Sequence, residues 1–116
     1  MNNELSELKQ KLREFAESRD WDQFHSPKNL SMAICGEAGE LSEIFQWLTE
    51  TQSQNLTDDQ LKQASQEMAD ILLYIIRLSD KLGVDLFKAA TDKIEVNAIK
   101  YPIDKARGNA KKYDKL

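Results

Sequence analysis

The sequence is poor in the residues that build disulfide frameworks and nitrogen- or sulfur-ligated metal sites. It has one cysteine, Cys35, and one histidine, His25, so an internal disulfide is excluded and zinc, haem and iron-sulfur sites lack ligands. No apolar run approaches the roughly 18 residues that a membrane-spanning helix needs. The most apolar stretch, ADILLYIIRL, contains Asp70 and Arg77 and begins two residues after Glu67. We therefore expect no association with a membrane.

The charge balance argues against a general affinity for polyanions. The 20 acidic and 16 basic side chains give a net charge of -4 and a pI near 5.0, which provides no positive field for nucleic acid. The charged, amphipathic start MNNELSELKQKLREF and the single cysteine lead us to expect a reducing cytoplasm. A length of 116 residues predicts one domain, residues 1–116, which completes its apolar burial by self-association.

Apolar residues recur at helical spacing in four segments, which predicts four helices joined by short connections. The expected helices span residues 2–18, 28–50, 58–82 and about 85–101. There is no β-type alternation of useful length, so the predicted fold is an all-α four-helix bundle. Between the first two helices we expect an ordered, aromatic-rich loop, and after the fourth a basic, loosely held tail at about residues 103–116.

Local signals mark the ends of these helices. Ser26 is suited to an N-cap with Pro27 at the first helical position, and Thr57 followed by Gln60 resembles a capping box. Gly83 suits the left-handed position that ends a helix.

Two acidic pairs lie in the apolar stripes of the second and third expected helices. Glu37 and Glu40 match Glu67 and Asp70 at an offset of 30 residues. An antiparallel hairpin can bring these pairs together, because residues three apart are neighbours on a helix surface. For either pair alone, a partly exposed helix would be a sufficient explanation. The matching positions on adjacent helices favour a common site.

Four carboxylates in a partly dry space would repel by about 4 kcal/mol per close pair at an effective dielectric near 20. Protons could neutralise them through raised pKa values, but a hard cation does so better. Mg²⁺ prefers carboxylate oxygens and water. We therefore predict a site for Mg²⁺, with Mn²⁺ as a substitute, whose ligands are Glu37, Glu40, Glu67 and Asp70.

The pattern E-x-x-E, 26 residues, then E-x-x-D is similar to the metal motif of the MazG-like all-α nucleoside triphosphate pyrophosphohydrolases. The segments DWDQFHSPKNL, GEAGELSEIFQW, EMADILLYIIRL and KIEVNAIKYP resemble the small members, in particular dCTP pyrophosphatases and integron-associated MazG proteins. The resemblance covers about residues 13–113. It implies a dimer or tetramer that cleaves deoxynucleoside triphosphates, dCTP-like or carrying modified pyrimidines, to the monophosphate and pyrophosphate in nucleotide-pool house-cleaning.

Carboxylate-held Mg²⁺ can bridge phosphate oxygens and activate a water molecule for attack on phosphorus. Glu40 lies at the edge of its stripe, where water can reach it, so it is the candidate to accept the proton of that water, with Glu37 beside it.

Aromatic residues near the acids predict a nucleobase pocket. The rings of Trp21, His25 and Trp47 suit base stacking, and in the resembling dCTP pyrophosphatases these positions and that of Tyr74 line the substrate pocket. A core tryptophan and a loop-anchoring histidine are the alternatives. Those eukaryotic enzymes carry a histidine where this chain has Leu12, so the resemblance does not transfer a base preference.

A polar stripe on the fourth helix is the candidate for binding phosphate. Lys93, Asn97 and Lys100 follow each other at helical spacing and match the family's K-x-x-x-N segment, although surface lysines are often only solvated. The basic residues that could close over the phosphates from the tail are Arg107, Lys111 and Lys112.

Two rival functions follow from the same residues. A non-enzymatic helical interaction or regulatory module would use the acids as a docking surface and would show little stabilisation by Mg²⁺. A di-iron carboxylate bundle is disfavoured, because such sites use Glu-x-x-His pairs and His25 lies in neither acidic motif.

Overall fold

The computed structural model describes residues 3–116 and shows helices and no strand among them, which confirms the all-α prediction. The chain divides into two compact units, Met1–Val84 and Asp85–Leu116. The helices of the first unit are α1 (Asn3–Ser18), η1 (Asp22–Phe24), α2 (Pro27–Phe45), α3 (Glu50–Ser53) and α4 (Asp58–Leu82). Those of the second are α5 (Leu86–Lys100), α6 (Ile103–Ala106) and η2 (Tyr113–Lys115).

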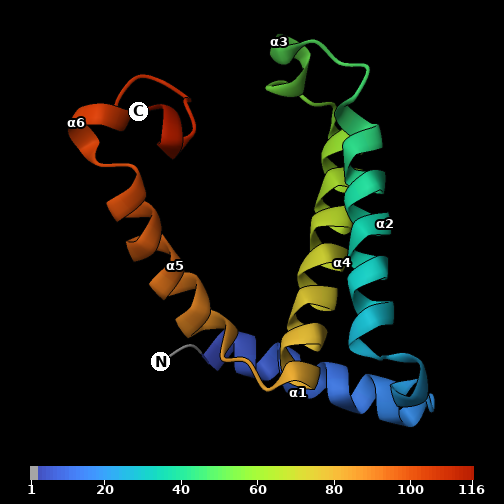
Figure 1. Ribbon diagram of the computed structural model, residues 1–116. Helices are drawn as coiled ribbons and strands as arrows, with labels where there is room; N and C mark the ends of the chain where they lie inside the picture. Colours follow the sequence, from blue (N-terminus) through green and yellow to red (C-terminus); the bar gives the residue numbers. More distant parts are fainter. Residues whose placement is uncertain (1–2) are drawn as a thin grey trace. The chain divides into compact units, whose positions relative to one another are not determined.

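The first unit is organised around the hairpin of α2 and α4. These two helices lie side by side and antiparallel, and α1 packs against the C-terminal part of α4 (Figure 1). Its fully buried apolar side chains are Ala16 of α1, Leu30 of α2, and Ala64 and Ile76 of α4. Each of these three helices therefore contributes to one small core, and the hairpin fixes which faces of α2 and α4 meet.

The helix ends follow the signals in the sequence. The Ser26 hydroxyl accepts a hydrogen bond from the Asn29 amide at 3.1 Å, with Pro27 as the first helical residue. Thr57 and Gln60 form the reciprocal capping box, with both bonds close to 3 Å. Gly83 ends α4 at φ 67°, which an L side chain adopts only with strain. All three predicted boundaries are confirmed.

The second helix ends earlier than predicted. Instead of continuing to residue 50, α2 stops at Phe45 and a short turn leads into α3. The cause is local, because Thr49 adopts an extended backbone and forms its own capping box with Gln52. Trp47 therefore lies in a turn and not on the face of a helix.

The second unit is built from α5 and the segment after it. Asp85 caps α5 by accepting a hydrogen bond from the Lys88 amide at 3.0 Å, and α5 ends at Lys100, two residues before a proline. The tail has more structure than the sequence suggested, because the rings of Tyr101 and Tyr113 meet edge to face at 6.2 Å. No helix in the described part of the chain is long and apolar enough to cross a membrane.

The apolar second face of α4 is partly covered within the first unit. Leu72, Leu73 and Ile76 form this face, and an apolar face of this kind needs cover from another element or from another subunit. Ile76 is instead 2% exposed and belongs to the core, and Leu73 is half-buried. Leu72 remains 42% exposed, so only part of this face lacks cover.

Candidate metal and nucleotide site

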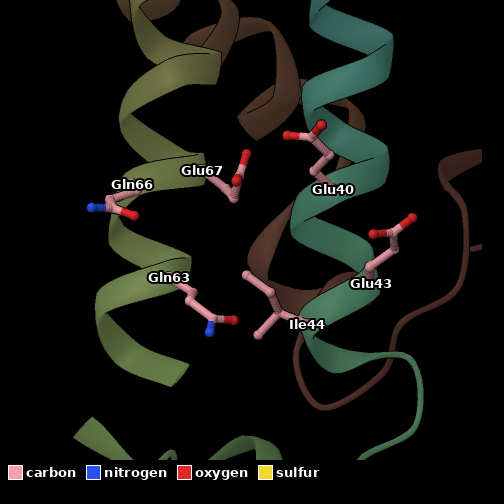
Figure 2. Close-up of a pocket in the computed structure, with 6 residues that line it drawn as sticks. All are labelled: Glu40, Glu43, Ile44, Gln63, Gln66 and Glu67. Atoms are coloured by element: carbon pink, nitrogen blue, oxygen red, sulfur yellow. The ribbon is translucent and has the colours of Figure 1, made fainter. Parts of the chain in front are cut away.

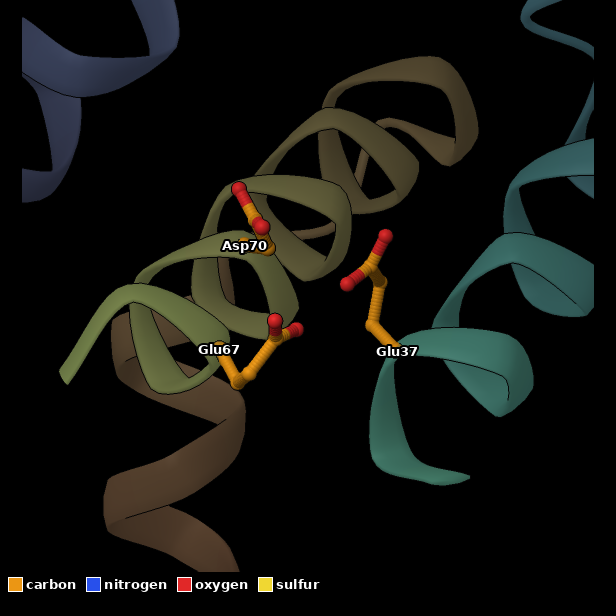
Figure 3. A group of neighbouring side chains, drawn as sticks. All are labelled: Glu37, Glu67 and Asp70. Atoms are coloured by element: carbon orange, nitrogen blue, oxygen red, sulfur yellow. The ribbon is translucent and has the colours of Figure 1, made fainter. Parts of the chain in front are cut away.

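Three carboxylates meet between α2 and α4. Glu37 reaches from α2 towards Glu67 and Asp70 of α4, as Figure 3 shows, and one oxygen of each lies within 4.8 Å of the others. Glu67 and Asp70 share a face because they are three residues apart on one helix. The antiparallel hairpin then brings Glu37 opposite them, as the sequence predicts.

The protein provides few hydrogen-bond partners for these carboxylates. The Oε2 atoms of Glu37 and Glu67 are buried, and neither has a hydrogen-bond partner in the described part of the chain. The pKa of Glu37 is raised to about 7, because its protonated form shares a hydrogen bond with Glu67, its carboxyl loses water, and Glu40 and Asp70 add negative charge. For Glu67 the hydrogen bond with Glu37 acts to lower the pKa, but lost hydration and the same two charges raise it overall.

The donor set fits a hard divalent cation. Every group in the cluster offers a carboxylate oxygen, the donor that Mg²⁺ and Mn²⁺ prefer, and no nitrogen or sulfur ligand lies among them. The two buried oxygens lack hydrogen-bond partners among the described residues, and a cation bound to them would take the place of those partners. The residues present therefore suit the metal that the sequence predicts.

Glu40, the fourth predicted ligand, lies beside this cluster but is not one of the three carboxylates within 4.8 Å of one another. It is exposed and borders a neighbouring cavity of about 470 Å³, and Figure 2 shows it facing Glu67 across the hairpin. Its negative charge contributes to the raised pKa values of Glu37 and Glu67, so it lies within electrostatic reach. Glu67 borders the same cavity, and the other residues around it are Glu43, Ile44, Gln63 and Gln66.

A second cavity joins the acids to aromatic side chains. Its volume is about 490 Å³, and it is bordered by Glu37 and Asp70 together with Trp21, His25 and Tyr74. Its remaining lining residues are Leu8, Lys11, Leu12, Phe15, Leu73 and Arg77. The structure thus brings three of the four predicted aromatic residues to the same cavity as two of the predicted metal ligands.

The other predicted binding residues lie elsewhere. Trp47 is 86% exposed in its turn and borders neither cavity. Lys93, Asn97 and Lys100 are exposed on α5, which belongs to the second unit, so their role remains a prediction. The same holds for the basic residues of the tail, Arg107, Lys111 and Lys112.

Sequence reasoning missed the part played by Arg77. This residue is only 5% exposed, and its Nε donates a hydrogen bond to Nδ1 of His25 at 3.1 Å. A signal was present, because Glu67, Asp70, Tyr74 and Arg77 follow each other at spacings of three, four and three on α4. That spacing places all four on one helix face.

Acidic residues on two sides hold the Arg77 guanidinium. Nη2 donates to Asp22 at 2.6 Å, and Nη1 lies 3.5 Å from Asp80. Asp22 also pairs with Lys81, and Asp80 accepts two hydrogen bonds from Arg13 of α1 at 2.6 and 2.7 Å. The hydrogen bonds from Arg13 are the main cause of a lowered pKa for Asp80. Together these contacts tie α1, η1 and α4 into one support behind the cavity.

Comparison with known proteins shows which family the chain belongs to. A family model described as the MazG-like family matches residues 32–116, which is most of the chain. The chain belongs to the MazG-like family. This MazG-like chain is 39% identical to mouse dCTP pyrophosphatase 1 over 87 residues, which cover 73% of the chain and 51% of the mouse protein. With the human protein the identity is 39% over 84 residues, covering 71% and 49% respectively.

The MazG-like chain therefore spans about half the length of the curated relatives it matches. A crystal structure of a pyrophosphatase from Archaeoglobus fulgidus matches this chain over nearly its whole length. Its TM-score is 0.81 at 36% identity, and the match covers 88% of this chain and 95% of that one. The family and the fold are thus supported by both sequence and structure.

Proposed function

We propose that this MazG-like protein is a Mg²⁺-dependent nucleoside triphosphate pyrophosphohydrolase. Its substrates would be deoxynucleoside triphosphates with dCTP-like or modified pyrimidine bases, and its products the monophosphate and pyrophosphate. The observation that carries the proposal is that Glu37 and Asp70 of the carboxylate cluster border the same cavity as Trp21, His25 and Tyr74. One end of that cavity suits metal-bound phosphates and the other suits a flat base.

The chain's own residues divide the chemistry between them. Glu37, Glu67 and Asp70 would hold the cation, which would supply positive charge to offset the negative charge of the phosphates. Glu40 is exposed and lies outside the tight cluster, so water can reach its free carboxylate. It would orient the attacking water and accept its proton, with Glu37 alongside.

The base would stack on the rings of the second cavity. Contact of one base with an aromatic side chain contributes about 1 to 3 kcal/mol and tolerates different bases. Leu12 adds an apolar wall where the resembling dCTP pyrophosphatases carry a histidine, so one hydrogen-bonding group is missing there. We therefore propose a base preference that differs in detail from that of the dCTP pyrophosphatases among the relatives.

The proposal includes contributions from outside the first unit. Lys93, Asn97 and Lys100 of α5 offer donors for the triphosphate, and we propose self-association to a dimer or tetramer. The support for association is the exposure of large apolar side chains on α4, with Leu61 at 54% and Met68 at 52%. The compartment we propose is the reducing cytoplasm.

A panel of natural and modified nucleotides tests the activity. The assay measures pyrophosphate and orthophosphate separately, with Mg²⁺, with Mn²⁺ and with a chelator. We expect pyrophosphate release that requires the metal and falls by about 100-fold or more in Glu40→Gln, the range typical of a lost general base. The control is Glu7→Gln, which neutralises an exposed acid on α1 outside both cavities.

Three results would contradict the proposal. Release of orthophosphate would indicate cleavage at another bond, and turnover without metal would remove the carboxylate cluster from the mechanism. Full activity in Glu40→Gln would exclude that residue as the base.

A further inference from the structure

We propose that Arg77 is a positioning residue that fixes His25 in the tautomer carrying its proton on Nε2. The cavity then presents one fixed hydrogen-bond donor beside Trp21. Such a donor selects a nucleobase that offers an acceptor, either a ring carbonyl oxygen or an imine nitrogen. This choice of ligand rests on the proposed function, whereas the tautomer rests on the contacts of His25 alone.

The tautomer follows from the chemistry of the two side chains. The Nε atom of a guanidinium always carries one hydrogen and never accepts, so its contact with Nδ1 of His25 at 3.1 Å requires a lone pair on Nδ1. A neutral imidazole carries a single N–H. With Nδ1 bare, that hydrogen must sit on Nε2.

Arg77 is held in the orientation that this contact needs. Its side chain is 6% exposed and its guanidinium is engaged on two further sides, by Asp22 at 2.6 Å and by Asp80 at 3.5 Å. Asp22 belongs to η1, three residues before His25, so the same arginine holds both the Asp22 side chain and the His25 ring. A planar fork with several fixed acceptors has little freedom to turn away.

The charges around His25 favour the neutral ring. Burial is the main cause of its lowered pKa, and the positive charges of Arg77 and Lys81 lower it further against the opposing effect of Asp22. An imidazolium would also place a second N–H against the Nε–H of Arg77. The two observations agree on a neutral ring with one available donor.

The Nε2 atom is the part of His25 left to meet a ligand. No hydrogen bond to it is found among residues 3–116, and the ring borders the cavity with Trp21 and Tyr74. A histidine that only anchors its loop would use Nδ1 in the same way, but the proton on Nε2 would then have no effect on binding. This difference separates the two roles by experiment.

Nitrogen NMR tests the tautomer directly, because His25 is the only histidine in the chain. In ¹⁵N-labelled protein at pH 8 we expect one protonated-type signal for Nε2 and one unprotonated-type signal for Nδ1. In Arg77→Met we expect the two shifts to move towards each other as the tautomers mix. Averaged shifts or a protonated Nδ1 in the unaltered protein would overturn the proposal, even if Arg77→Met does not fold.

A matched pair of substitutions tests the donor. The amide nitrogen of His25→Gln occupies the place of Nε2, whereas the amide of His25→Asn reaches only the place of Nδ1. With dCMP as the probe, we expect His25→Asn to bind roughly tenfold more weakly and His25→Gln to stay within about threefold, as one hydrogen bond predicts. Equal weakening in both variants would overturn the role of Nε2.

The outcomes separate this proposal from the proposed function. A fixed Nε2–H tautomer together with no binding of dCMP, and no pyrophosphate release from any nucleotide, would overturn the proposed function while supporting positioning by Arg77. Pyrophosphate release from a nucleotide together with mixed tautomers of His25 would support the proposed function and overturn positioning by Arg77.

Discussion

Replacing Glu37 by glutamine should stabilise the protein in the absence of metal. The substitution keeps the size of the side chain and removes one negative charge from a cluster whose oxygens lie within 4.8 Å of each other. At that separation two unit charges repel by about 0.9 kcal/mol at the dielectric of water and about 3.5 kcal/mol at an effective dielectric of 20. Because the cluster is partly open to solvent, we expect a gain of about 1 to 3 kcal/mol.

The pH dependence of this gain identifies its cause. The folded-state pKa of Glu37 is about 7, above its ordinary value of 4.5, so the folded protein binds more protons than the unfolded chain between these values. The stability of the unaltered metal-free protein should therefore fall as the pH rises from 4.5 to about 7. Glu37→Gln removes this loss, so its advantage should be small at pH 5 and full at pH 8.

Thermal unfolding with a chelator measures the effect. For a chain of 116 residues, about 1 to 3 kcal/mol corresponds to a rise in Tm of about 4 to 12 °C at pH 8. In Mg²⁺ the order should reverse if the cation binds as proposed, because binding to the intact cluster would stabilise the folded state. Glu7→Gln is the control and should show neither effect. Glu37→Gln that is unstabilised at pH 8, and still gains as much Tm from Mg²⁺ as the original, would refute the reasoning.

Three further substitutions test the support of the site and the helix ends. Asp80→Asn should lower the free energy of unfolding by about 1 to 3 kcal/mol at pH 7, more than Arg13→Met, because it weakens the pairing of the buried Arg77. Since the pKa of Asp80 is lowered, denaturant titrations should show the stability difference between Asp80→Asn and the original protein vanish as the pH falls through that pKa. Gly83→Ala should cost about 1 kcal/mol and Gly83→Asn less, because asparagine tolerates the φ of 67°, and equal Tm values would contradict this. Thr57→Ala should cost about 1 kcal/mol through loss of the capping box, while Thr57→Ser, measured in the same denaturant series, should cost little.

The sequence predicted the fold wherever the cause was local. The boundary at Gly83 and the caps at Ser26 and Thr57 each depend on residues within four positions, so the pattern determines them. The end of α2 is also local, but the apolar stripe continues beyond Phe45 to Leu48 and so predicts a longer helix than the cap formed by Thr49 and Gln52 allows. At this position the apolar periodicity predicts a continuing helix and the capping residues predict a new one, and the structure agrees with the capping residues.

The candidate site was predictable to the extent that it follows helix geometry. The offset between the acidic pairs was enough to bring Glu37 to Glu67 and Asp70, because an antiparallel hairpin leaves few other arrangements. It was not enough to place Glu40, whose distance from the cluster depends on how the two helices are rotated. Contacts across the chain, such as Arg77 with His25, depend on how a loop folds back, and helical periodicity contains no information on that.

One helix, α4, contributes to both parts of the candidate site, with Glu67 and Asp70 in the acidic cluster and Tyr74 and Arg77 beside the rings. Its backbone therefore fixes the spacing between the two parts. The distance along its axis from Asp70 at the acidic end to Arg77 at the ring end is about 10 Å, set by the rise of 1.5 Å per residue. Because a packed helix does not stretch, substitutions at the ring end can alter which molecule fits without shifting the carboxylates proposed to bind the cation. The two properties can therefore evolve separately on this scaffold, and insertions within this stretch of α4 should be tolerated least of all.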